Sequence, residues 1–196
     1  MKVLRAGLGI GCLLLPGAVL AHSPIKGLDN FYAGFLHPVF VPSHLLSSLA
    51  LGILFGQQGP RSVQPAIITF LVAIVAGLAA TLLALPWDLG IGLLVGAALT
   101  GGLVAIDRRL PLPVYLLLAG LLGFMIGIDS AQNDLAGRGR LAALLGTTIA
   151  AYLILLYAMV FADWLAKGEW QRIGLRVLGS WAAASALLVL SLRFAA

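Results

Sequence analysis

Long apolar stretches separated by short polar ones run through most of the chain. Beyond residue 30, six stretches approach the ~20 residues that a membrane-spanning helix needs. They lie near 32–56, 65–85, 89–106, 112–129, 141–162 and 173–193. The separators hold most of the charged residues and leave no room for a soluble domain. The pattern therefore predicts an all-α fold, a polytopic bundle of six transmembrane helices.

Residues 1–21 have the pattern of a secretory signal peptide. Lys2 and Arg5 precede the apolar run LGIGCLLLPGAVL, and Val19-Leu20-Ala21 forms a small-residue cleavage site. The apolar run is short for a bilayer core of about 30 Å, which favours cleavage over the alternative of an uncleaved first membrane helix. Two units are expected: the signal peptide, 1–21, and a single six-helix domain, 22–196.

Composition agrees with lipid as the main solvent, because 61% of the residues are hydrophobic and only 10% are charged. The net charge of +5 includes no basic run with interleaved aromatic residues, so no nucleic-acid partner is expected. The chain also lacks a nucleophile motif such as Gly-x-Ser-x-Gly, which argues against an intramembrane hydrolase. We expect a membrane protein that is not an enzyme.

The loops predict an orientation in the bacterial inner membrane. A cleaved signal leaves the mature N-terminus on the periplasmic side and places the loops near residues 61, 108 and 167 inside. Those inner loops hold six Lys and Arg residues against four in the outer ones, in agreement with the positive-inside rule. Six helices then return the C-terminus to the periplasmic side.

Glycines recur at four-residue spacing on several of the predicted helices. Small residues at this spacing let helix backbones approach closely inside a membrane, so close packing is expected at these positions. The pairs are Gly52 and Gly56, Gly92 and Gly96, and Gly123 and Gly127.

The stretch GFLHPVFVPSHLL, residues 34–46, places two histidines and two prolines inside an apolar run. On a regular helix His37 and His44 share a face but stand about 10 Å apart along the axis. Pro42 has no N–H and leaves the carbonyl of Pro38 without its helical partner, so an irregular segment is predicted between the histidines. At membrane depth such backbone is tolerated only where it lines a cavity or is buried in protein.

Two interpretations of the histidines remain open. Neutral imidazoles are suitable ligands for nickel, zinc or copper, and Asp29, about two turns before His37, would add an oxygen ligand. Alternatively, His37 and His44 are hydrogen-bonded bundle residues at a proline kink.

His22 would become the N-terminus after cleavage, and its α-amine and imidazole would chelate a divalent ion. A histidine left there by chance is the other interpretation.

The combination of a signal ending before a histidine, six apolar segments and AGFLHPVFVPSHLLSSLALGILFG resembles the HupE/UreJ family of small membrane proteins associated with hydrogenase and urease genes. Members typically contain His-Pro-x-x-Gly-x-Asp-His in the first mature helix. His37, Pro38 and His44 match this motif in identity and spacing, whereas Val41 replaces the glycine and Ser43 the aspartate.

A second family motif, roughly Phe-His-Gly-x-Ala-His-Gly-x-Glu, is similar to LLGFMIGID at residues 121–129. Gly123 and Gly127 align, and Asp129 stands in place of the glutamate. Leu122 and Ile126 occupy the two histidine positions.

The resemblance implies facilitated diffusion of a divalent transition metal across the inner membrane. Nickel is the expected ion, with cobalt, copper or zinc as alternatives, and no tightly bound cofactor is expected. His37 and His44 would be ligands, with Asp129 as their acidic partner. The second hypothesis is a non-transporting membrane subunit or scaffold that assists metalloenzyme assembly through helix–helix contacts. Expected partners are the lipid bilayer, the metal ion, and either metalloenzyme maturation proteins or further copies of the chain.

Overall fold

The computed structural model describes residues 29–81, 88–132 and 134–195. All regular secondary structure in these ranges is helical, which confirms the all-α prediction. The predicted signal peptide and His22 lie outside the described residues. The helices are α1 (Asn30–Phe40), α2 (Pro42–Gln58), α3 (Pro60–Ala80), α4 (Gly90–Ile106), α5 (Leu112–Asp129), α6 (Gly137–Leu165) and α7 (Glu169–Ala195).

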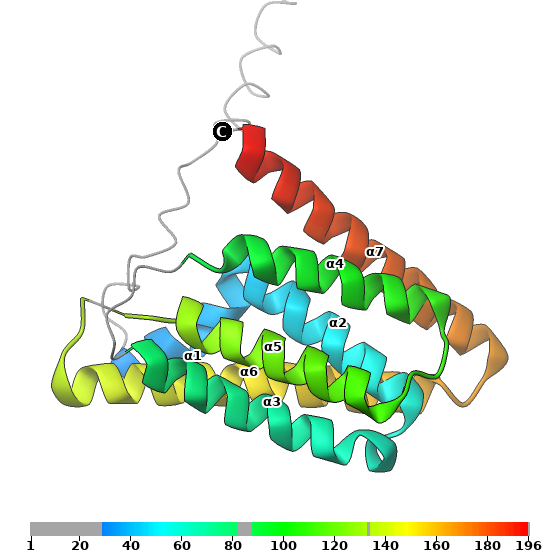
Figure 1. Cartoon of the computed structure of the whole chain (residues 1–196), viewed down its shortest axis with the longest axis horizontal. Coiled ribbons are helices and arrows are strands. Elements are labelled where there is room, and N and C mark those ends of the chain that lie inside the picture. Colours follow the sequence, from blue (N-terminus) through cyan, green and yellow to red (C-terminus); the bar gives the residue numbers. More distant parts are fainter. Residues whose placement is uncertain (1–28, 82–87, 133, 196) are drawn as a thin grey trace, which may run out of the picture.

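The helices form a bundle around α2 (Figure 1). α2 packs against α4 and α6, while α3 packs against α5, α1 against α6, and α7 against α4. The central position of α2 explains why Leu51, Leu54 and Phe55 are fully buried. By contrast, α7 contributes few residues to the core and exposes large apolar side chains such as Trp181 and Leu188. Such a surface suits a helix that faces lipid.

Four helices are long and apolar enough to span a membrane, namely α3, α5, α6 and α7, and α1 with α2 forms a fifth candidate as a bent pair. α4 is apolar but has 17 residues. At 1.5 Å per residue it is about 26 Å long, somewhat shorter than a bilayer core of about 30 Å. The structure therefore supports a helical membrane bundle, and the sixth span stays a prediction.

The predicted break between the two histidines is confirmed. α1 ends at Phe40, α2 begins at Pro42, and the two helices are bent by 71°. Val41 between them has extended backbone (φ −92°, ψ 107°), the conformation favoured before a proline. Pro42 occupies the first position of α2, where its missing N–H does no harm.

Pro38 lies inside α1, and a neighbouring helix compensates for its missing N–H. The carbonyl of Gly34, four residues earlier, has no helical donor because Pro38 cannot provide one. The Thr147 hydroxyl of α6 donates a hydrogen bond to this carbonyl at 3.0 Å. A Cβ on Gly34 would collide with the backbone carbonyl of Ala143, so only glycine permits this approach of α1 to α6.

The predicted close packing at the glycine pairs is confirmed. Added Cβ atoms at Gly52 and Gly56 would collide with α6, and those at Gly123 and Gly127 with the backbone of α3. At Gly92 and Gly96 the neighbours are α5 side chains instead.

The predicted separator at 56–64 is much shorter in the structure. Only Gly59 lies between α2 and α3, and its φ of 85° favours glycine. α3 begins at Pro60, five residues before the predicted start, so polar residues form its first turn. The polar residues mark where the apolar span ends. They do not mark where the helix ends, because a helix can continue beyond the bilayer core.

The two ends of the bundle differ in charge. We call the end with His37, His44 and Asp129 the histidine end, and the end with Gln58, Arg108 and Arg109 the arginine end. Of the Lys and Arg residues that the structure describes, six lie at the arginine end and three at the histidine end. The six are Arg61, Arg108, Arg109, Lys167, Arg172 and Arg176, and the three are Arg138, Arg140 and Arg193.

Candidate metal site at the broken helix

The helix break brings the two imidazoles together. His37 lies in the last turn of α1 and His44 near the start of α2, where it is fully buried. Their ring centroids are 5.3 Å apart, with the planes at 75°. A regular helix would separate the two residues by about 10 Å along its axis, so the bend at Val41 is what produces this pair.

Asp129 binds His44 from the end of α5. The Nε2–H of His44 donates to Oδ2 of Asp129 at 2.9 Å, and the side chain of Asp129 is only 15% exposed. The other oxygen, Oδ1, accepts the backbone N–H of Leu89 at 3.0 Å. Leu89 immediately precedes α4. One carboxylate therefore connects the start of α2, the end of α5 and the start of α4.

The hydrogen bond to Asp129 also determines which nitrogen of His44 can act as a ligand. In the neutral ring, a carboxylate that accepts from Nε2 holds the proton there and leaves a lone pair on Nδ1. Nδ1 makes no hydrogen bond within the described parts of the chain. A carboxylate that holds one nitrogen while the other faces a metal is a common arrangement for a histidine ligand.

Three buried serines, Ser43, Ser47 and Ser48, lie close to His44 in the sequence of α2, and a serine inside a helix usually bonds a nearby backbone carbonyl. Ser47 agrees with that view, because its hydroxyl reaches the carbonyls of Ser43 (2.7 Å) and Leu93 (2.9 Å). The hydroxyls of Ser43 and Ser48 are also buried, yet neither makes a hydrogen bond to a described residue. A buried hydroxyl without a partner is unfavourable, so these serines are unusual in a purely structural role.

Asp29 is not brought to this pair, and Asp129 reaches only one edge of the His44 ring. Asp29 is exposed and precedes the first residue of α1, eight residues before His37, which is about 12 Å along a helix. Asp129 lies at the Nε2 edge of the His44 ring, away from Nδ1. Within the residues that the structure describes, no three His, Cys, Asp or Glu side chains form a group placed to hold one metal ion.

Apolar side chains lie next to the site along α5. Ile126 and Leu122 precede Asp129 by three and seven residues, so they share its helix face. Both are buried, and Leu122 fills the space over Gly96 of α4. From the His44–Asp129 pair toward the arginine end, the interior of the bundle is therefore apolar at Ile126 and Leu122.

A bent first span, a histidine pair of which His44 is fully buried, and a carboxylate at a helix end define the chain as a helical membrane protein with a polar site at one end of its bundle. The profile of the HupE / UreJ protein family matches residues 10–189, and the chain belongs to this family. This membership indicates a metal-related accessory or transport function in a membrane. No curated protein and no solved structure matches the chain.

Proposed function

We propose that this HupE/UreJ protein lets a divalent transition metal ion cross the bacterial inner membrane by facilitated diffusion. Nickel is the ion that the family favours. The observation behind the proposal is the contact between His37 and His44 at a helix break, with Asp129 holding His44. An energetic reason also supports it, because ionisable groups within membrane segments are costly and usually mark an ion or substrate path.

In this proposal Nδ1 of His44 and the imidazole of His37 are the protein's main ligands for the passing ion. Imidazole nitrogen suits nickel, copper, zinc and cobalt, and backbone carbonyls at the break would add oxygen ligands. Asp129 fixes the orientation of His44 and adds negative charge near the ion. Two imidazoles hold a divalent ion less tightly than a complete cage, and weak binding is what passage requires, since the ion must also leave.

The proposed orientation of the chain in the membrane rests on the charge at the two ends. The basic excess at the arginine end supports a cytoplasmic position for that end, which places the histidine end at the periplasm. Asp29 is exposed there, and His22 precedes it by seven residues in the sequence. Both would attract the ion before it reaches the histidine pair.

The test is metal uptake into liposomes that contain the purified full chain and a metal-sensitive dye. Wild type is compared with His37→Gln and His44→Gln, with Asp134→Asn as a control because Asp134 is exposed. We expect each histidine substitution to lower nickel uptake by about tenfold or more, which is the lower limit for losing a supporting contact at a metal site. Unchanged uptake in both variants, at equal protein content, would exclude the ligand assignment.

A second candidate function is a membrane scaffold that assists metalloenzyme assembly without moving metal. The apolar interior at Leu122 and Ile126 favours it, because a divalent ion would have to pass buried hydrocarbon there. The same hydrogen bond of His44 to Asp129 would then serve stability alone. In that case His44→Gln lowers the yield of folded protein, wild-type liposomes take up no more nickel than empty ones, and a constant partner protein co-purifies.

A further inference from the structure

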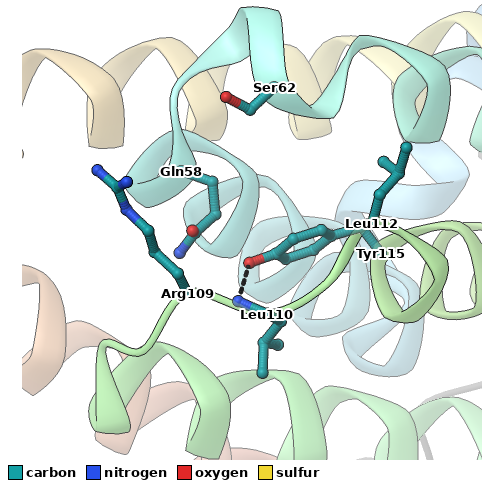
Figure 2. Close-up of a pocket in the computed structure, with 6 residues that line it drawn as sticks. All are labelled: Gln58, Ser62, Arg109, Leu110, Leu112 and Tyr115. Atoms are coloured by element: carbon teal, nitrogen blue, oxygen red, sulfur yellow. Dashed lines mark hydrogen bonds between the residues drawn. The ribbon is translucent and has the colours of Figure 1, made fainter.

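A small cavity of about 270 Å³ lies at the arginine end, far from the histidine pair. Figure 2 shows its lining, which comes from the end of α2, the first turn of α3, the loop after α4 and the start of α5. The lining residues are Gln58, Ser62, Arg109, Leu110, Leu112 and Tyr115. Pockets for drug-sized ligands typically have about 300–1,000 Å³, so this cavity suits a small group or the head of a larger molecule.

The polar groups of this cavity are rich in hydrogen-bond donors, and no Asp or Glu lines it. Arg109 contributes a guanidinium, Gln58 an amide and Ser62 a hydroxyl. Tyr115 is only 4% exposed, and its Oη accepts the backbone N–H of Leu110 at 2.9 Å. Oη makes no other hydrogen bond to a described residue, so its own O–H can donate.

The positive charge of Arg109 is not neutralised by a neighbouring acid. The nearest acid in sequence, Asp107, pairs instead with Arg172, whose Nη2 lies 2.8 Å from Oδ2. Arg109 itself forms no ion pair in the described ranges. A guanidinium in a partly enclosed, acid-free cavity favours a bound anion.

The start of α3 reinforces this preference. α3 begins at Pro60, and no side chain caps its N-terminus. Ser62 belongs to this first turn and lines the cavity. Pro60 has no N–H and the Ser62 N–H donates to the Gly59 carbonyl at 3.1 Å, so α3 contributes the positive end of its aligned peptide dipoles, which favours an anion.

The cavity also has an apolar side. Leu112, the first residue of α5, is 39% exposed and lines the cavity together with Leu110. The cavity therefore combines donors for an anionic head with apolar contacts at the end of a membrane bundle. Basic pockets between transmembrane helices on the cytoplasmic side are known to bind anionic lipid heads.

We propose that this cavity binds a phosphate group, that of an anionic phospholipid or of free phosphate. Arg109 pairs with the phosphate oxygens, and Gln58, Ser62 and Tyr115 donate hydrogen bonds to them. The proposal does not depend on metal transport, because the cavity and the histidine pair lie at opposite ends of the bundle.

The test compares Arg109→Gln with Arg108→Gln in the purified full chain. Arg108 is the matched control, since it is the adjacent exposed arginine and its side chain does not line the cavity. Native mass spectrometry measures retained phosphatidylglycerol or phosphatidylcholine. Thermal unfolding is followed with each lipid and, separately, with inorganic phosphate. We expect phosphatidylglycerol to bind wild type and Arg108→Gln, and to bind Arg109→Gln about tenfold more weakly, which corresponds to about 1.4 kcal/mol.

The probes separate the two sources of phosphate. A lipid site is supported if phosphatidylglycerol stabilises the chain, inorganic phosphate does not, and the stabilisation is weaker in Arg109→Gln than in Arg108→Gln. Stabilisation by inorganic phosphate with the same dependence supports a site for the free anion. Equal binding of phosphatidylcholine and phosphatidylglycerol, or equal losses in Arg108→Gln and Arg109→Gln, would overturn the proposal.

Discussion

Replacing Asp129 with asparagine tests the connection between the helix break and the rest of the bundle. The carboxylate accepts two donors, the Nε2–H of the fully buried His44 on one oxygen and the part-buried Leu89 N–H on the other. An asparagine has a single oxygen, and its NH₂ group would face one of these donors. One of these donors is then left without an acceptor, which costs about 1–3 kcal/mol where the donor is shielded from water. For a chain of this size the melting temperature should fall on the order of 2–12 °C.

The assay is thermal unfolding of the purified chain, together with nickel binding measured by calorimetry. Asp134→Asn is the matched control, because it makes the same chemical change at an exposed residue and should alter stability by less than about 0.5 kcal/mol. Loss of the group that orients His44 should also weaken nickel binding about 10- to 100-fold. If Asp129→Asn matches Asp134→Asn in both melting temperature and nickel affinity, the role assigned to this carboxylate is wrong.

Two further substitutions test the position and the composition of the site. Gly34→Ala would force a Cβ into the backbone of α6 and displace α1, lowering stability by about 1–3 kcal/mol, whereas Gly102→Ala meets open space and should be neutral or slightly stabilising. Thermal unfolding compares them, and equal melting temperatures would contradict the packing argument. Ser43→Asp adds a carboxylate next to His44 in the sequence, and Ser43→Asn is its uncharged control of the same shape. We expect the aspartate variant to bind nickel more tightly than the asparagine variant when both are measured by calorimetry. Equal affinities would refute the expectation that a carboxylate at position 43 supplies a ligand.

The helices and the break could be predicted from the sequence because both have local causes. Apolar length predicted the helical segments, and the residues before and after Pro42 obey steric rules that act within one turn. The boundaries were less accurate where polar residues continue a helix, as in the first turn of α3. Apolarity reports the extent of the bilayer core, not the extent of the hydrogen-bonded helix.

The contacts of the site could be predicted only in part. Asp129 and His44 are 85 residues apart, and nothing local in either segment specifies their hydrogen bond. The resemblance of residues 121–129 to a family motif indicated Asp129 as an acidic partner of the two histidines, but it did not specify which histidine or which atoms would meet. The cavity at the arginine end was missed entirely, because Gln58 and Tyr115 are ordinary residues at helix ends until the fold places them beside Arg109.

The position of the apolar residues on α5 has a consequence for any transport mechanism. An ion held at the histidine pair would next meet Ile126 and Leu122, which lie about 5 and 10 Å from Asp129 along the helix. Moving an ion from water into an apolar interior costs several kcal/mol even after relaxation, and no charged side chain at these two positions offsets this. A path along this face of α5 would require α4 and α5 to separate near Gly96, where Leu122 fills the space that the missing side chain leaves. A scaffold needs no such separation. The two proposed functions therefore differ in whether α5 must move relative to α4.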